Sequence, residues 1–189
     1  MLMQRHRSLV VISNMQQLIL PILDTEDLFL WNVCGIMGLA NKLEVPVLVM
    51  EHKGLGPGLE PVRRLAQGSA PCEIDTFSFV SAPAAVERIR STGRDQLILA
   101  GNETHISVMH TALEAQSKGF EAYVLAEACA ARDREDHQAA LPRIRQAGVP
   151  IVTREMVLFE WIPCSVDPIY IETSIAFVKH PHPFPKTQP

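Results

Sequence analysis

A carboxylate, an imidazole and a hydroxyl stand close together in the chain as Glu103, His105 and Ser107. A serine hydroxyl becomes a nucleophile when a base beside it takes its proton, and either His105 or Glu103 could supply that base. One interpretation of the chain is therefore a hydrolase that uses Ser107 as its nucleophile. The alternative is that the three side chains do no chemistry.

The elements that must position these residues alternate between short apolar runs and longer helical stretches. Uninterrupted apolar runs are typical of strands buried on both faces, and apolar residues at three- to five-residue spacing are typical of helices. We expect strands at 9–12, 47–50, 73–79, 96–100, 122–125 and 151–153. We expect helices at 26–44, 61–67, 84–91, 104–118, 134–146, 154–161 and from 168 onward. This order predicts an α/β three-layer sandwich, with a six-stranded, mostly parallel sheet and helices on both faces.

Single residues mark several of the expected helix ends. Thr104 is a candidate N-cap and Gly119 a natural stop for the helix that would carry Ser107. Pro142 falls inside the expected helix at 134–146, so we expect a kink or a later helix start there. Asp167 and Pro168 make a good N-cap and first turn for the last helix.

The bulk composition narrows the class of protein. The chain has 189 residues and a formal net charge of −4, with no basic run of the kind that binds nucleic acid. No apolar stretch reaches the roughly 18 residues of a membrane span. The four cysteines are scattered, without CxxC or Cys/His metal spacing. We expect a cytosolic protein with one domain at 1–179 and a Pro/His-rich tail at 180–189 that packs on another subunit.

Five segments resemble one known family in their order and spacing. They are the strand end Ser-Asn-Met-Gln at 13–16, the loop His-Lys-Gly-Leu-Gly-Pro at 52–57, Phe-Ser-Phe at 77–79, Gly-Asn-Glu-Thr-His-Ile-Ser-Val at 101–108, and Ile-Val-Thr-Arg-Glu at 151–155. The chain resembles the isochorismatase-like hydrolases, in their isochorismatase domain-containing branch, from about 9 to 179. The resemblance implies that family's α/β fold and an assembly of two or more subunits.

The resemblance also implies a chemistry whose residues are replaced here. The family's amide hydrolases use a Cys nucleophile, an Asp that moves the proton and a Lys that holds charge near both. Position by position, these become Ser107, Asn14 and Ile74. The resemblance further implies a cis peptide between Asn102 and Glu103, with the backbone N–H groups of Glu103 and Ser107 binding an oxyanion.

The three replacements together predict a neutral site. Asn14 cannot take a proton, Ile74 carries no charge, and a helix dipole is worth about 1 kcal/mol, too little to ionise an alcohol near pH 7. Removing the Asp and the Lys together leaves no unpaired buried charge. The sequence therefore favours a catalytically degenerate oligomer that binds a small neutral ligand or a partner. Two alternatives remain open: a divergent hydrolase of amide, imide or ester bonds that uses Ser107, and a structural oligomer with a filled pocket.

Other polar and aromatic residues could line such a pocket, namely Lys53, His105 and Phe77. The resemblance already accounts for Glu103 and His105 as residues typical of the branch. We expect no metal and no cofactor, because Glu51 and His52 are neighbours whose side chains should diverge, and His180 and His182 lie in the tail. Strand alternation should point Asp75 away from Ile74.

Overall fold

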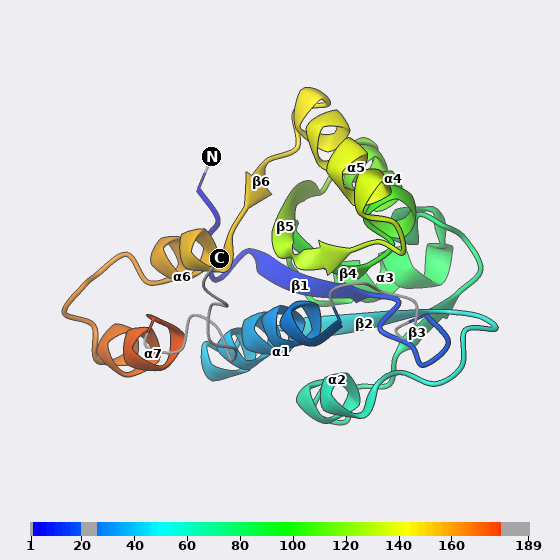
Figure 1. The fold of residues 1–189 in the computed structure, drawn as a ribbon. Coiled ribbons are helices and arrows are strands. Elements are labelled where there is room, and N and C mark those ends of the chain that lie inside the picture. Colours follow the sequence, from blue (N-terminus) through cyan, green and yellow to red (C-terminus); the bar gives the residue numbers. More distant parts are fainter. Residues whose placement is uncertain (1, 20–25, 179–189) are drawn as a thin grey trace, which may run out of the picture.

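The protein is described here by a computed structural model that covers residues 2–19 and 26–178. Six strands form one sheet in the order β3–β2–β1–β4–β5–β6, with every neighbouring pair parallel (Figure 1). The strands are β1 (Ser8–Ser13), β2 (Val47–His52), β3 (Cys72–Ile74), β4 (Gln96–Asn102), β5 (Glu121–Ala130) and β6 (Ile151–Val152). The predicted α/β sandwich is confirmed, and the sheet is wholly rather than mostly parallel.

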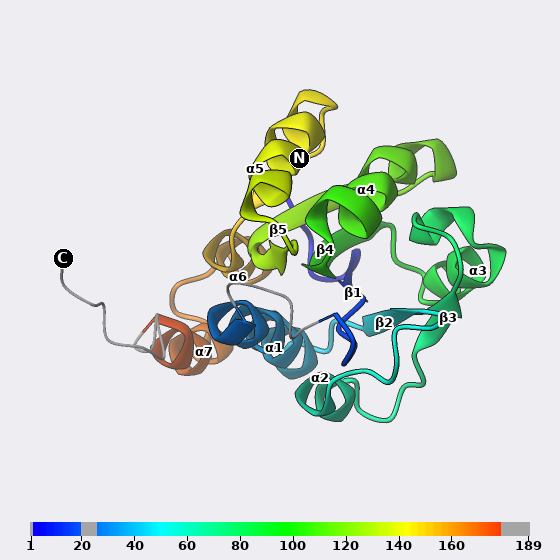
Figure 2. The same cartoon turned by 45° about the vertical axis from the view of Figure 1, so that its right-hand side comes forward.

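Helices cover both faces of the sheet (Figures 1 and 2). They are α1 (Glu26–Lys42), α2 (Glu60–Leu65), α3 (Pro83–Ser91), α4 (Met109–Ala115), α5 (Arg134–Gln146), α6 (Arg154–Trp161) and α7 (Pro168–Val178). The residues of β1 alternate between two cores. Val10 and Ile12 pack with residues of α1, α2 and α6, whereas Leu9 and Val11 pack with residues of α3, α4 and α5. None of the helices in the described ranges has the length and apolar character needed to cross a bilayer.

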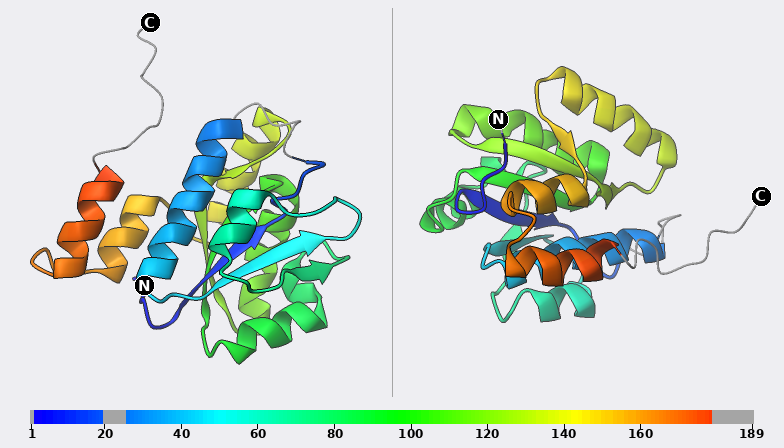
Figure 3. Two further views of the ribbon diagram at one scale, coloured as in Figure 1. Left: turned by 90° about the horizontal axis from the view of Figure 1, so that it is seen from below. Right: turned by 90° about the vertical axis from the view of Figure 1, so that its left-hand side faces the viewer.

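The last two helices extend the layer formed by α1. Figure 3 shows α6 and α7 beside α1, and Lys42 of α1 forms an ion pair of 2.9 Å with Glu172 of α7. Asp167 Oδ1 accepts a hydrogen bond from the Ile169 N–H at 2.8 Å, which confirms the predicted cap of α7. The expected tail at 180–189, with His180 and His182, lies outside the described residues.

Three local expectations are wrong. The third strand ends at Ile74 rather than at 79, because Thr76 Oγ1 bonds to the Ser78 carbonyl and begins a turn. Glu103, not Thr104, occupies the N-cap position before Ser107 and makes no side-chain cap bond, and the Thr104 hydroxyl bonds instead to the Ala130 carbonyl at 2.9 Å. Helix α5 begins at Arg134 and continues through Pro142, with Asp133 as its N-cap, so the expected later start is wrong and the kink stays a prediction.

The strand order reverses between β1 and β4, which lie side by side in the middle of the sheet. Such a switch point opens a crevice at the carboxyl ends of the two strands, because the chain leaves them toward opposite faces. Ser13 and Gly101 are register partners at this end. Gly101 has φ +118°, and a Cβ there would overlap the backbone of Ser13, so only glycine suits the position.

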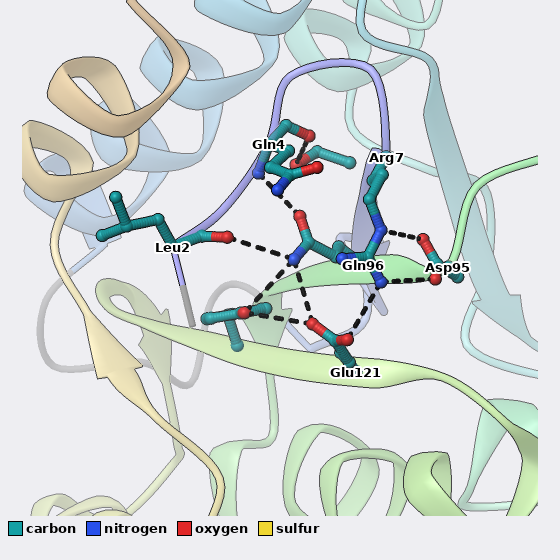
Figure 4. A network of polar contacts seen from close by, with 8 residues as sticks. Leu2, Gln4, Arg7, Asp95, Gln96 and Glu121 are labelled. Atoms are coloured by element: carbon teal, nitrogen blue, oxygen red, sulfur yellow. Dashed lines mark hydrogen bonds and ion pairs between the residues drawn. The ribbon is translucent and has the colours of Figure 1, made fainter. Parts of the chain in front are cut away.

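The opposite end of the sheet is tied together by an ionic and amide network (Figure 4). Arg7 bonds to both Asp95 oxygens, at 2.9 and 2.5 Å, and to Glu121 at 2.9 Å. Gln96 joins this network through Glu121 at 3.0 Å and also bonds to the backbone of Gln4. The network therefore fastens the first residues of the chain to β4 and β5.

This network predicts a loss of stability in acid. Arg7 holds the pKa of Asp95 below its usual range, and hydrogen bonds from Gln96 and then Arg7 do the same for Glu121. A lowered folded-state pKa contributes stability above the unfolded value of about 4, and that contribution is lost as the pH falls through the folded value. Arg7→Met should therefore be destabilising at pH 7 and flatten the fall in stability between about pH 5 and pH 3.

Urea unfolding at several pH values checks the expectation. Arg90→Met, at an exposed position of α3, is the control and should leave the pH profile unchanged. An Arg7→Met variant with the wild-type slope between pH 5 and pH 3 would contradict the role given to the network.

Candidate functional site

Two buried polar side chains meet where β1 and β4 end. Asn14 follows β1 directly and has φ +49°, a left-handed conformation that Asn tolerates better than most residues. Ser107 lies in a short π-helical turn, η3 (Thr104–Val108), which follows β4 and leads into α4. Asn14 Nδ2 donates a hydrogen bond of 2.8 Å to Ser107 Oγ, and both residues are buried. The structure thus brings together two of the three positions that the resemblance assigned to chemistry.

The turn between β4 and η3 is made by Glu103 in the left-handed region, with φ +62° and ψ +65°. The described residues contain no cis peptide bond, so the expected cis bond between Asn102 and Glu103 is wrong. The left-handed backbone conformation of Glu103, rather than a cis bond, turns the chain between β4 and η3. The Glu103 N–H donates to Asn102 Oδ1 at 2.7 Å. One of the two expected oxyanion donors is therefore already occupied inside the protein.

The carboxylate of Glu103 is buried beside a cationic side chain. Its Oε1 lies 2.7 Å from Arg132 Nε, which comes from the loop between β5 and α5. His105 Nδ1 lies 3.5 Å from Glu103 Oε2, and His105 Nε2 lies 3.5 Å from Asp136. Glu103 and His105 are thus engaged with charged neighbours and with each other.

A third contact joins the same two segments. Thr104 Oγ1 donates to the Ala130 carbonyl, so it accepts its second hydrogen bond from His137 Nδ1–H at 2.9 Å. Burial lowers the pKa of His137 and favours the neutral ring. Consecutive residues 103–105 are therefore each fastened to the segment 130–137.

A cavity of about 350 Å³ opens over the Asn14–Ser107 pair. Ligand sites range from about 300 to 1,000 Å³, so this one lies at the lower end of that range. The lining residues are Asn14, Leu18, Ile19, His52, Leu55, Phe77, Glu103, Ile106, Ser107 and Arg132. A larger groove of about 770 Å³ lies along α5, but Asn14 and Ser107 are not among its lining residues.

The residues that we expected at the pocket divide into two groups. Phe77 lines the cavity at its mouth. Lys53 is exposed and pairs with Asp75 at 3.4 Å, and His105 contacts Glu103 but is not among the lining residues. Ile74 is 2% exposed and packs in the core with α3 and α4, so it does not line the cavity. Asp75 is exposed, which confirms that it points away from Ile74.

Several residues of the site were not anticipated from the sequence. Arg132, His52 and Leu55 line the cavity from three different loops or strand ends. A cation near Glu103 could have been anticipated only by knowing that the β5–α5 loop reaches the end of β4. The ring of His52 stacks on Phe77 with centroids 5.8 Å apart, although the two residues lie on different strands or turns.

Gln16 fixes the loop that carries His52 and Leu55. Its Nε2 donates to the carbonyls of His52 at 3.0 Å and Gly56 at 2.7 Å, and its Oε1 accepts from the His52 N–H at 2.8 Å. The side chain is buried, so these bonds replace hydration that it has lost. Gln16 therefore shapes the cavity without lining it.

Gln16→Leu should loosen that loop while keeping a side chain of similar size. The His52 N–H and the carbonyls of His52 and Gly56 would each lose a hydrogen bond, and such a bond contributes about 0.5–1.5 kcal/mol to stability. Chemical denaturation and amide hydrogen exchange at 52–58 measure the effect. Gln17→Leu, at the exposed neighbour, is the control. Unchanged exchange at 52–58 would contradict the role of Gln16.

Neither a cluster of metal ligands nor a reactive thiol is found among the described residues that line or adjoin the cavity. Within residues 2–19 and 26–178, no three His, Cys, Asp or Glu side chains gather as a metal site would require. Glu51 turns toward Gly58 and Arg63, where burial raises its pKa, while His52 faces the cavity, so the two do diverge. Burial raises the pKa of Cys129 to about 12, which keeps the thiol protonated and unreactive.

Comparison with known proteins identifies relatives of most of the chain. The isochorismatase domain model matches residues 9–156. Isochorismatase domain-containing protein 2 of Xenopus laevis is 33% identical over 141 residues, which cover 70% of this chain and 65% of the frog protein. Protein 2A of Mus musculus is 32% identical over 153 residues, 78% of this chain and 71% of the mouse protein. The chain spans about two thirds of the length of the curated relatives that it matches.

Solved structures share the fold at lower identity. The MAR1 ribonuclease of Caenorhabditis elegans superimposes with a TM-score of 0.87 at 20% identity, over 100% of this chain and 98% of that one. The Escherichia coli YcaC gene product, described as an octameric hydrolase of unknown specificity, gives 0.84 at 22% identity, over 92% of this chain and 89% of that one. Nicotinamidase PncA of Bacillus subtilis gives 0.69 at 16% identity, over 77% and 99%. At these identities the likeness shows the fold alone. Because the domain model matches most of the sequence and relatives above 30% identity carry the same domain, the chain belongs to the isochorismatase family, in its isochorismatase domain-containing branch.

Proposed function

We propose that this protein is a catalytically degenerate member of its family that binds a small neutral ligand in the cavity over Asn14 and Ser107. The observation that carries the proposal is the hydrogen bond from Asn14 Nδ2 to Ser107 Oγ. The group beside the hydroxyl is an amide, which has no lone pair basic enough to take a proton near neutral pH. An alcohol held by such a partner stays protonated and is a weak nucleophile.

The surrounding geometry supports the same conclusion. The Glu103 N–H bonds to Asn102 Oδ1, which leaves one fewer donor for a developing negative charge. Ile74, at the position where the resemblance places a lysine, packs in the core and brings no cation to the cavity. Glu103 and Arg132 neutralise each other across 2.7 Å, so the cavity carries no excess charge and suits a neutral ligand.

A hydrolase screen tests the proposal directly. Purified protein is incubated with amides, imides and esters, and Ser107→Ala is assayed beside it. We expect no turnover above the Ser107→Ala background for any substrate. Robust turnover that Ser107→Ala abolishes would overturn the degenerate assignment and replace it with a serine-dependent hydrolase.

The serine hydrolase is a second candidate function because the Glu103 carboxylate lines the same cavity as Ser107. A carboxylate at this place could act on Ser107 through an intervening water molecule. This candidate predicts that a fluorophosphonate labels Ser107 covalently in the folded protein. Under the degenerate assignment we expect no label, and mass spectrometry of the digested protein distinguishes the two.

We further propose that the protein works as a homo-oligomer. Exposed apolar side chains lie on α6, on α7 and on the loop between them, at Met156, Phe159, Val166 and Ile171. Large exposed apolar side chains are common in contacts between proteins. One structural neighbour is described as octameric, which supports an assembly without defining its size here. Light scattering that showed only monomers would contradict this part of the proposal.

A further inference from the structure

Three buried side-chain atoms of the cavity-lining residues have no hydrogen-bond partner among the described residues. They are the oxygen acceptors Asn14 Oδ1 and Glu103 Oε2 and the ring nitrogen His52 Nε2. Asn14 and Glu103 are 3% and 4% exposed, and His105 Nδ1 lies 3.5 Å from Glu103 Oε2 without forming a hydrogen bond. An unpaired buried acceptor is unfavourable, so a ligand that donates a hydrogen bond to Asn14 Oδ1 and to Glu103 Oε2 would bind more tightly than one that does not.

The same cavity also offers a donor. Ser107 Oγ accepts the hydrogen bond from Asn14 Nδ2, so the hydroxyl hydrogen is free to point elsewhere. Because Asn14 Nδ2 and Oδ1 belong to one amide group, this bond also places Oδ1 near the Ser107 hydroxyl. A ligand that complements them therefore carries a hydrogen-bond donor next to an acceptor on one edge.

The walls of the cavity suit a flat ring. Phe77 is 57% exposed at the mouth and stacks on the His52 ring with an interplanar angle of 21°. Leu18, Leu55 and Ile106 supply apolar surface. An exposed aromatic ring held in place by a second ring is a ready stacking platform for a planar ligand.

From these three features we infer that the cavity binds a neutral heteroaromatic ring bearing an amino group next to a ring nitrogen. The inference rests on the proposed function, because it names the ligand class of that same site. The amino group has two hydrogens, one for Asn14 Oδ1 and one for Glu103 Oε2, and the ring nitrogen accepts from Ser107 Oγ–H. A lactam edge offers a single N–H and would leave one of the two acceptors unpaired. A cationic ligand gains less, because Arg132 already neutralises Glu103.

Binding of small matched rings tests the inference. The probe is 2-aminopyrimidine, and the comparisons are pyrimidine, which lacks the amino group, 2-pyrimidinone, which has a lactam edge, and aniline, which lacks the ring nitrogen. Dissociation constants come from ligand-observed NMR titration of the full chain. One hydrogen bond is worth about tenfold in affinity, so 2-aminopyrimidine should bind at least about tenfold more tightly than each comparison ring.

Two variants assign the contacts. Ser107→Ala removes the donor to the ring nitrogen and should lower the affinity for 2-aminopyrimidine to that for aniline, while leaving aniline unchanged. Asn14→Gly suits the positive φ and removes one acceptor, so it should weaken both amino compounds. Lys53→Ala, outside the cavity, is the control and should change neither. If Asn14→Gly does not fold, the Ser107→Ala comparison still decides.

The outcomes separate this inference from the proposed function. Equal binding of pyrimidine and 2-aminopyrimidine, tighter binding of 2-pyrimidinone, or no saturation by any ring overturns the inference. The first two of these results leave a ligand-binding protein, because a ring still occupies the cavity. Ser107-dependent turnover in the hydrolase screen overturns the proposed function whatever the ring preference.

Discussion

Gly101→Ala is expected to destabilise the protein by about 4 kcal/mol or more, a large share of the stability of an ordinary domain. Gly101 has φ +118°, a conformation that L-residues rarely adopt, and its added methyl group would overlap the backbone of Ser13. The neighbour is the backbone of a central strand rather than a movable side chain. Relief would require β1 and β4 to separate at the point where Asn14 and Ser107 meet.

Gly119→Ala is a matched control for this prediction. Gly119 also has a positive φ, of +84°, but nothing lies within 4 Å of the position its Cβ would take. Its replacement should therefore cost only the backbone term of about 1–2 kcal/mol. Urea denaturation of both variants measures the difference. Equal losses would show that the close approach to Ser13 has no energetic consequence.

Ile74→Lys should also cause a large loss, of about 3–5 kcal/mol, because it places a charge without a partner in an apolar cluster. The loss should be greatest at low pH. Burial lowers the folded-state pKa of a lysine, so the penalty shrinks as the pH rises toward the unfolded value of about 10.4. Glu73→Lys, at the exposed neighbour on β3, is the control and should change the free energy of unfolding by about 0.5 kcal/mol or less.

Adding Asn14→Asp to Ile74→Lys should restore part of the lost stability. If positions 14 and 74 still belong to one inherited site, the new carboxylate and ammonium will pair. A double-mutant cycle should then give a stabilising coupling of at least about 1 kcal/mol. Additive losses would show that the two side chains do not reach each other and that Ile74 belongs to the core alone.

The fold could be predicted largely from the sequence because local patterns specify it. The uninterrupted apolar run at 9–12 indicates a buried strand, and β1 has no exposed residue. Asp167 before Pro168 indicates a helix start, and Asp167 caps α7 as expected. The end of β3 was missed because the turn depends on one hydroxyl, Thr76 Oγ1, which bonds to a carbonyl two residues later.

The candidate site was predictable only in part. Asn14 and Ser107 were paired through the resemblance, and the structure places them in contact. The side-chain contacts between loops were not predictable, because no periodicity relates Arg132 to Glu103 or His52 to Phe77. Lys53 was expected in the pocket because it lies in the glycine loop, but the loop turns its side chain toward Asp75. The left-handed turn at Glu103 likewise has no local signal, since glutamate seldom adopts it.

Residues 103, 104 and 105 each contact the segment 130–137, and these three contacts restrict the length of the connection between β5 and α5. Lengthening or shortening the chain between Ala130 and Arg134 would shift Arg132, Asp136 and His137 out of register with all three partners at once. The carboxylate of Glu103 would then stand in the protein interior without its counter-charge. Insertions at this one connection would thus reshape the cavity through Glu103 and Arg132 while leaving the Asn14–Ser107 pair in place.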